Sequence, residues 1–199
     1  GNIIFDYLRQ GNPGIEAFYN ISNFKGTFID SRFYLLNSFN TSRYGFELDR
    51  NFYSYKTKYI GGLQMYKTKT TDDIEKRDTT LSDVDLSFVE HDFWFGYAFP
   101  LTPKNGIFKK RTHLVLSARY ANDRFIDGPE VNERYNYKYH DNYMFLGQLS
   151  YSRENFYKSK MIYGFGRTED IPVGDLYSFI FGWEADQFFK RWYAGTTIR

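Results

Sequence analysis

The residues with the clearest potential for chemistry are a histidine and a serine in one predicted strand. His113 and Ser117 are four residues apart, so both side chains point to the same face of the strand. Some barrel lipases set their catalytic serine and histidine on the barrel wall in this way. Arg119 shares that face, and polar residues on one strand face are typical of a hydrated barrel interior. We therefore interpret His113 and Ser117 as polar wall residues and predict that the protein is not an enzyme.

The other chemical motifs are weak. His91 and His140 are far in sequence from His113, so no metal-type histidine pair is formed, and no nucleophile elbow or glycine-rich phosphate loop occurs. The adjacent acids Glu169 and Asp170 could suggest a cation site, but such pairs usually belong to a solvated loop. The sequence predicts no catalytic residue, no cofactor and no metal.

A compact loop is predicted between two strands at residues 166–174. Glycine at both ends permits close backbone approach, and proline stiffens the segment. Its arginine offers a five-donor fork to a carboxylate. The candidate residues are Gly166, Arg167, Glu169, Asp170 and Pro172, with Glu184 in the next strand as the candidate acidic partner. The loop either enters a barrel lumen, where Arg167 acts as a structural lock, or remains an ordinary surface loop.

The elements around these residues alternate with a period of two. In Tyr143–Ser152, the residues Tyr143, Phe145, Gly147, Leu149 and Tyr151 share one face. Eight steps at about 3.3 Å give roughly 26 Å, near the height of a lipid-facing band with aromatic girdles. Aromatic residues make up 22% of the chain, and Tyr and Trp collect where apolar medium meets water.

Lysines and connection lengths favour a hydrated interior. A strand predicted over residues 53–65 carries Lys56 and Lys58 on its non-aromatic face, where a dry core would penalise them. The predicted connections alternate between a long and a short class, as in outer-membrane barrels. The long ones are residues 67–83, 121–142 and 166–174, and the short ones are residues 49–51, 153–155 and 184–190.

Composition excludes several alternatives. The mean hydropathy is −0.60, and no apolar run approaches the roughly 18 residues of a spanning helix. The net charge of +2 with dispersed Lys and Arg does not favour a nucleic-acid partner. Cysteine is absent, which excludes disulfides. The remaining alternative to a membrane barrel is a soluble ligand-binding barrel or sandwich.

The last third of the chain resembles a known group. Residues 165–174, Phe-Gly-Arg-Thr-Glu-Asp-Ile-Pro-Val-Gly, followed by an aromatic strand ending in Trp183-Glu184, look like the barrel of the BamA-type superfamily. In that family a lumen loop presents an arginine to an acidic partner, a role that only Arg167 could take here. Thr168 stands where the family motif has glycine. The resemblance implies a barrel associated with POTRA domains that inserts or translocates polypeptides.

We therefore predict an all-β protein: a single antiparallel transmembrane β-barrel domain over residues 1–199, with about 10 to 12 strands. The expected location is the bacterial outer membrane, with the lipid bilayer and unfolded outer-membrane or secreted polypeptides as partners. A passive pore is the alternative function. Because the alternation continues through residues 191–199, we also expect flanking segments or another chain to complete the barrel.

Overall fold

A computed structural model of the protein describes residues 2–7, 13–53, 57–76, 79–101, 111–132, 134, 136–160 and 168–199. Residues 2–7, 13, 75–76, 79–82, 111, 154–160 and 168–173 among these are described by their backbone alone.

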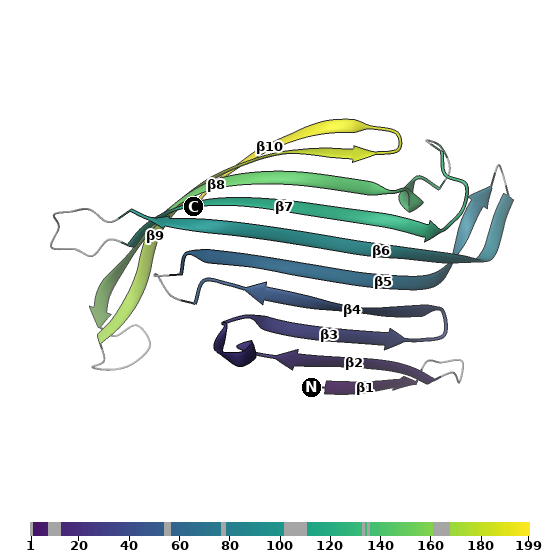
Figure 1. The fold of residues 1–199 in the computed structure, drawn as a ribbon, viewed down its shortest axis with the longest axis horizontal. Helices are drawn as coiled ribbons and strands as arrows, with labels where there is room; N and C mark the ends of the chain where they lie inside the picture. Colours follow the sequence, from purple (N-terminus) through teal and green to yellow (C-terminus); the bar gives the residue numbers. More distant parts are fainter. Residues whose placement is uncertain are drawn as a thin grey trace.

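In the described residues, ten strands form one sheet in which each strand pairs with its neighbours in chain order (Figure 1). The strands are β1 (Asn2–Tyr7), β2 (Pro13–Ile21), β3 (Asp30–Asn37), β4 (Thr41–Arg50), β5 (Tyr59–Lys76), β6 (Thr79–Pro100), β7 (Arg111–Asp127), β8 (Asn142–Lys160), β9 (Thr168–Asp186) and β10 (Lys190–Ile198). All nine pairings are antiparallel. The described helical elements are two short 3₁₀ turns, η1 (Phe24–Gly26) and η2 (Tyr137–Tyr139). The all-β class is confirmed, and the ten described strands lie within the predicted number of about 10 to 12.

The register places the aromatic residues of different strands on one face, which we call the aromatic face. Directly paired residues of antiparallel strands share a face, so each run of pairings forms a row across the sheet. One row is Leu63, Phe93, Tyr120, Phe145, Trp183 and Trp192, and the next is Gly61, Phe95, Ala118, Gly147, Phe181 and Ala194. The alternation read from the sequence is therefore kept across the middle of the sheet.

The aromatic face is exposed. Phe181, for example, retains 53% of its accessible surface and Trp192 retains 84%. Among the described residues no large side chain is fully buried, and the described strands form one sheet with no second layer against it. A two-layer sandwich is thus not observed in the described part of the chain.

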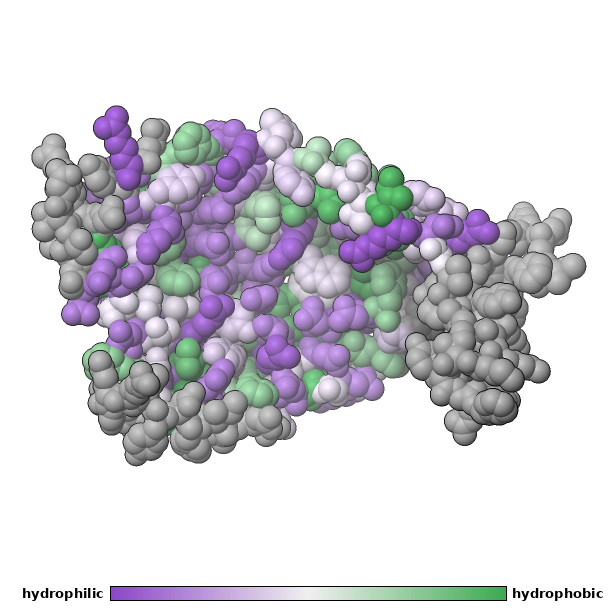
Figure 2. Space-filling model, turned by 180° about the vertical axis from the view of Figure 1, so that it is seen from behind, coloured by the Kyte–Doolittle hydropathy of each residue, from purple (hydrophilic) through white to green (hydrophobic). Residues whose placement is uncertain are grey.

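The opposite side, which we call the polar face, carries most of the paired charges. Two of its rows are Glu47, Gln64, Asp92, Ala121, Met144, Glu184 and Arg191, and Asp49, Gly62, Trp94, Arg119, Leu146, Gly182 and Tyr193. Seen from behind, the molecule shows hydrophilic side chains running across the sheet with smaller hydrophobic groups between them (Figure 2).

The predicted long connections are shorter in the structure because strand pairing continues into them. Residues 67–76 and 79–83 belong to β5 and β6, which pair up to Lys76 and Thr79 with a bulge near Asp72. β7 likewise continues to Asp127, so only residues 128–141 connect it to β8. The physical reason is that Thr-rich and charged segments still satisfy their backbone groups by pairing with each other.

The predicted turn at residues 153–155 is wrong, and so is the predicted loop at residues 166–174 over its described part, residues 168–174. Both segments lie in strands: Glu154–Lys160 of β8 pairs with Thr168–Gly174 of β9. The strand predicted from Tyr53 instead begins at Tyr59, so Lys58 is an exposed residue before β5 and gives no support for a hydrated interior. Lys56 lies outside the described residues.

The sheet is open among the described residues: β1 and β10 form its two edges, and no ladder joins them. Closure into a barrel therefore remains a prediction. No helix in the described part of the chain is long and apolar enough to cross a membrane.

Candidate functional site

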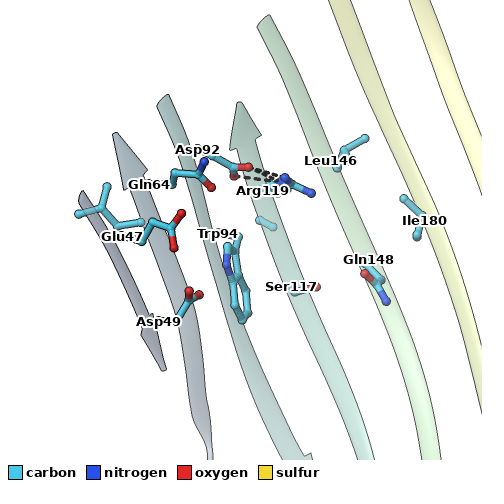
Figure 3. A pocket seen from close by; sticks show the side chains of 12 residues that line it. Glu47, Asp49, Gln64, Asp92, Trp94, Ser117, Arg119, Leu146, Gln148 and Ile180 are labelled. Atoms are coloured by element: carbon cyan, nitrogen blue, oxygen red, sulfur yellow. Dashed lines mark hydrogen bonds and ion pairs between the residues drawn. The ribbon is translucent and has the colours of Figure 1, made fainter. Parts of the chain in front are cut away.

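A depression of about 400 Å³ lies on the polar face, near the middle of the sheet (Figure 3). Strands β4 to β9 each contribute to its lining. The polar lining residues are Glu47, Asp49, Gln64, Asp92, Ser117, Arg119 and Gln148. Trp94, Leu146 and Ile180 add apolar surface, so the depression offers both hydrogen-bonding groups and a flat aromatic surface.

Trp94 lies against Gly62 of the neighbouring strand. A Cβ atom on Gly62 would stand 2.1 Å from Trp94 Nε1 and 2.7 Å from Asp49 Oδ1. Only glycine leaves this space free. The indole nitrogen and the carboxylate oxygen are therefore no farther apart than the sum of these two distances. In Figure 3, Asp49 and Trp94 lie side by side at one end of the depression.

Ion pairs between strands cross the polar face: three join adjacent strands, and one joins Arg43 of β4 to Glu90 of β6 across β5. They are Arg32–Glu47 at 3.5 Å, Arg43–Glu90 at 3.0 Å, Arg119–Asp92 and Arg191–Glu184 at 2.8 Å. Arg32–Glu47 and Arg191–Glu184 join directly paired positions, where opposite charges stabilise the register of the two strands. Because most of these side chains are partly solvent-exposed, each pair contributes only about 0–1 kcal/mol to stability.

A second cluster joins the connection between β7 and β8 to the neighbouring hairpin. Tyr139 packs with Ile74 and Leu86 in the described hydrophobic cluster, and its hydroxyl donates to Asp72 Oδ2 at 2.6 Å. Lys138 Nζ lies 3.0 Å from the same carboxylate oxygen. These hydrogen bonds, first from Tyr139 and then from Lys138, hold the pKa of Asp72 below its usual value.

Asp186 anchors the same connection from the other side. Its Oδ1 accepts the backbone N–H groups of Phe188 at 2.7 Å and Phe189 at 2.5 Å, which closes the β9–β10 turn. Its Oδ2 accepts the Tyr137 hydroxyl at 2.9 Å and lies 3.3 Å from His140 Nε2. Burial alone would raise the pKa of Asp186, but the backbone and hydroxyl donors together hold it below the usual value.

The lock predicted for Arg167 stays a prediction, because the arginine itself is not among the described residues. Gly166 and Arg167 lie outside the described residues. Glu169, Asp170 and Pro172 are backbone positions of β9 paired with Ser159, Lys158 and Phe156. Glu184 is bound by Arg191 of β10, with Nε to Oε2 at 2.8 Å and Nη2 to Oε1 at 3.1 Å.

The other predicted wall residues are confirmed in their facing. His113 pairs with Pro100 and Ser152, and Ser117 pairs with Gly96 and Gln148. These registers place both residues on the polar face, in separate rows of the sheet.

Sequence reasoning missed Asp49 and Trp94. The sequence did carry a signal for Trp94, because alternation along its strand places Trp94 on the same face as Asp92 and on the face opposite Phe93 and Phe95. Its nearness to Asp49 depends on the β4–β5–β6 register, which no local pattern encodes. In the described residues no group of three or more His, Cys, Asp and Glu side chains could hold a metal ion.

Comparison with known proteins gives no relative: no family model, no curated protein and no solved structure matches this chain.

Proposed function

We propose that this chain forms the wall of a bacterial outer-membrane β-barrel, with its aromatic face against lipid and its polar face lining a passage for small hydrophilic solutes. The observation that carries the proposal is the exposed aromatic face of a single-layer sheet. In water such a surface would be a strong aggregation liability, whereas lipid covers it without cost.

The borders of the aromatic face support a membrane-spanning band. On the aromatic face, four successive rows are apolar. The next row beyond them contains His91 and Asn122 at one end of the band, and Thr112, Arg153 and Asp175 at the other end. At about 3.3 Å per residue the outer rows are roughly 20 Å apart, comparable with the roughly 25 Å lipid-facing band of known barrels.

Aromatic residues with polar groups border this band. The outer row near His91 contains Tyr120, Trp183 and Trp192, and the opposite outer row contains Tyr151 and Tyr177. Tyr and Trp prefer the level of the lipid headgroups, and such girdles flank the apolar band of outer-membrane barrels.

The absence of cysteine from the sequence permits a direct test of facing. Leu149 on the aromatic face and Gln148 on the polar face are adjacent and form a matched pair for single-cysteine variants. In liposomes, a water-soluble maleimide should label Gln148→Cys and spare Leu149→Cys. Equal labelling of both in liposomes, and in water without detergent, would favour a soluble protein. Conductance in planar bilayers would then identify the passage.

Insertion or translocation of polypeptides is a second candidate function. It is implied by the resemblance of residues 165–174 and 183–184 to BamA-type barrels, and one observation favours it. No described strand pairs with the outer edge of β10, where Trp192 and Ile198 are 84% and 75% exposed. An unpaired edge is a template for adding another strand.

The two candidate functions give different results with an unfolded outer-membrane client. A cysteine at Thr196, on β10, should form disulfides with a cysteine-bearing client only if the edge accepts a strand. A cysteine at Gln64, on the interior strand β5, is the control. Conductance without client cross-linking favours the passive pore.

A further inference from the structure

We propose that the depression on the polar face binds an aliphatic ammonium group, with Asp49 as its counter-ion and the Trp94 indole as its packing surface. This inference rests on the proposed function, because the polar face must meet water for such a ligand to arrive. It adds to that function a preferred class of solute, the organic cation.

The first argument is the balance of charge in the depression. Glu47 accepts a hydrogen bond from the Tyr66 hydroxyl at 2.6 Å and pairs with Arg32. Asp92 is held by Arg119. Asp49 has neither an ion pair nor a hydrogen bond to its carboxylate among the described residues. Arg32, the cation that acts on Asp49 from the neighbouring strand, is itself ion-paired with Glu47, so Asp49 is the carboxylate of the depression that no described ion pair holds.

The second argument is the position of Trp94. Trp183 and Trp192 lie on the aromatic face, but Trp94 lies on the polar face and lines the depression. Because Gly62 has no side chain, the Trp94 indole and the Asp49 carboxylate both reach the space over this glycine. A cation over the face of Trp is attracted by the ring quadrupole, and Trp is the best of the aromatic residues for this contact. An indole beside an unpaired carboxylate is thus complementary to a cation with an apolar stem.

The third argument comes from the other lining groups. Gln64, Gln148 and Ser117 present side-chain oxygens, which accept hydrogen bonds from the three N–H donors of an ammonium group. An anionic solute would meet three carboxylates and one arginine. A neutral sugar could use the amides and the indole but would leave Asp49 without a counter-ion. The lining therefore favours an ammonium group over both.

The test uses binding to the intact chain in detergent micelles. A Trp183→Phe, Trp192→Phe variant leaves Trp94 as the only tryptophan, so its fluorescence reports the depression. Titration with 1,5-diaminopentane should change this signal saturably, and 1,5-pentanediol should not. Asp49→Asn should weaken diamine binding by about tenfold or more, because the charge-assisted contact is lost. Glu184→Gln, a polar-face acid outside the depression, is the matched control and should bind normally.

Several outcomes would overturn the inference. They are equal binding of the diol, diamine affinity unchanged by Asp49→Asn, and preferential binding of a sugar such as maltose. If Asp49→Asn does not fold, Asp49→Glu should fold and retain binding, while Trp94→Leu should lose it; the opposite pattern would contradict the proposal.

The source of the ammonium group and the proposed function are tested separately. A lysine-rich peptide that competes with the diamine points to polypeptides as a source, and a lack of competition points to small amines; either result supports ammonium recognition. Cysteine labelling in liposomes tests the membrane wall independently. Normal facing without diamine binding would refute only this inference, whereas diamine binding with equal labelling of both faces would refute only the membrane proposal.

Discussion

Asp72 and Asp186 hold the β7–β8 connection at two points outside the proposed membrane band. Each carboxylate accepts a tyrosine hydroxyl from that connection, Tyr139 for Asp72 and Tyr137 for Asp186. In both cases the pKa lies below the usual value, which means that the folded state favours the ionised carboxylate. By linkage, the stabilisation is complete at neutral pH and is lost as pH falls from the ordinary carboxyl pKa through the lowered one.

We therefore expect the connection to open in acid. Hydrogen exchange of residues 136–141 should quicken, after correction for the intrinsic rate, as pH falls from 7 to below about 4. Asp72→Asn should remove part of this pH dependence and cost about 1 kcal/mol at pH 7, since the site is partly exposed and the amide still accepts from Tyr139.

Asp127→Asn is the control for this prediction. Asp127 is an exposed acid at the end of β7, close to the same connection along the chain. The assigned role of Asp72 would be contradicted if Asp72→Asn left the pH dependence of hydrogen exchange unchanged, or if Asp127→Asn reduced that pH dependence equally.

At the scale of the elements, some strand glycines lie under large side chains of the next strand. Gly45 of β4 is opposite Tyr66 of β5. A Cβ on Gly45 would stand 2.1 Å from the backbone oxygen of Met65 and 2.5 Å from Tyr66 Cδ1. The Tyr66 ring thus occupies the space above the glycine, where it also stacks under the Arg43 guanidinium at 4.4 Å. Close packing between β4 and β5 depends on this arrangement.

Gly45→Ala should therefore destabilise the sheet by about 1–3 kcal/mol, because a backbone oxygen cannot move aside as a side chain can. Gly195→Ala in β10 is the control, since its nearest neighbour is the Tyr193 hydroxyl at 3.1 Å. Urea unfolding in detergent micelles, followed by far-ultraviolet circular dichroism, measures the difference. Equal stability of the two variants would show that the β4–β5 contact is looser than described.

At the scale of the whole molecule, the sheet separates its tryptophans between two environments. Trp183 and Trp192 belong to one row of the aromatic face, and Trp94 lies on the polar face. If the aromatic face meets lipid, these two environments are a bilayer interface and water.

Single-tryptophan variants in liposomes should show this separation. Brominated lipids should quench Trp183 and Trp192 strongly and Trp94 weakly, whereas aqueous iodide should quench Trp94 most. Replacement of the other tryptophans by Phe keeps the apolar character of each site. Strong lipid quenching of Trp94 would mean that the polar face is not turned to water.

The sequence by itself determined the strand class and the facing of residues. Steric alternation is local, so Phe145 and Leu149 could be assigned to one face of their strand, and Phe179 and Phe181 to one face of theirs, before any pairing was known. The same alternation placed His113 and Ser117 on the face of their own strand opposite Leu114 and Leu116. The aromatic content, which is also a property of the sequence, predicted an apolar surface larger than a soluble domain exposes.

Only the tertiary structure decided where the strands end and which polar residues meet. Residues 153–155 and 168–174 resemble turns locally, but pairing of β8 with β9 continues through both and satisfies their backbone groups. Glu184 had no local partner in the sequence, and pairing with β10 supplied Arg191. Asp49 and Trp94 are 45 positions apart in the chain, and the registers of two ladders bring them together over Gly62. Register is a non-local property, because it depends on all the pairs of a ladder at once.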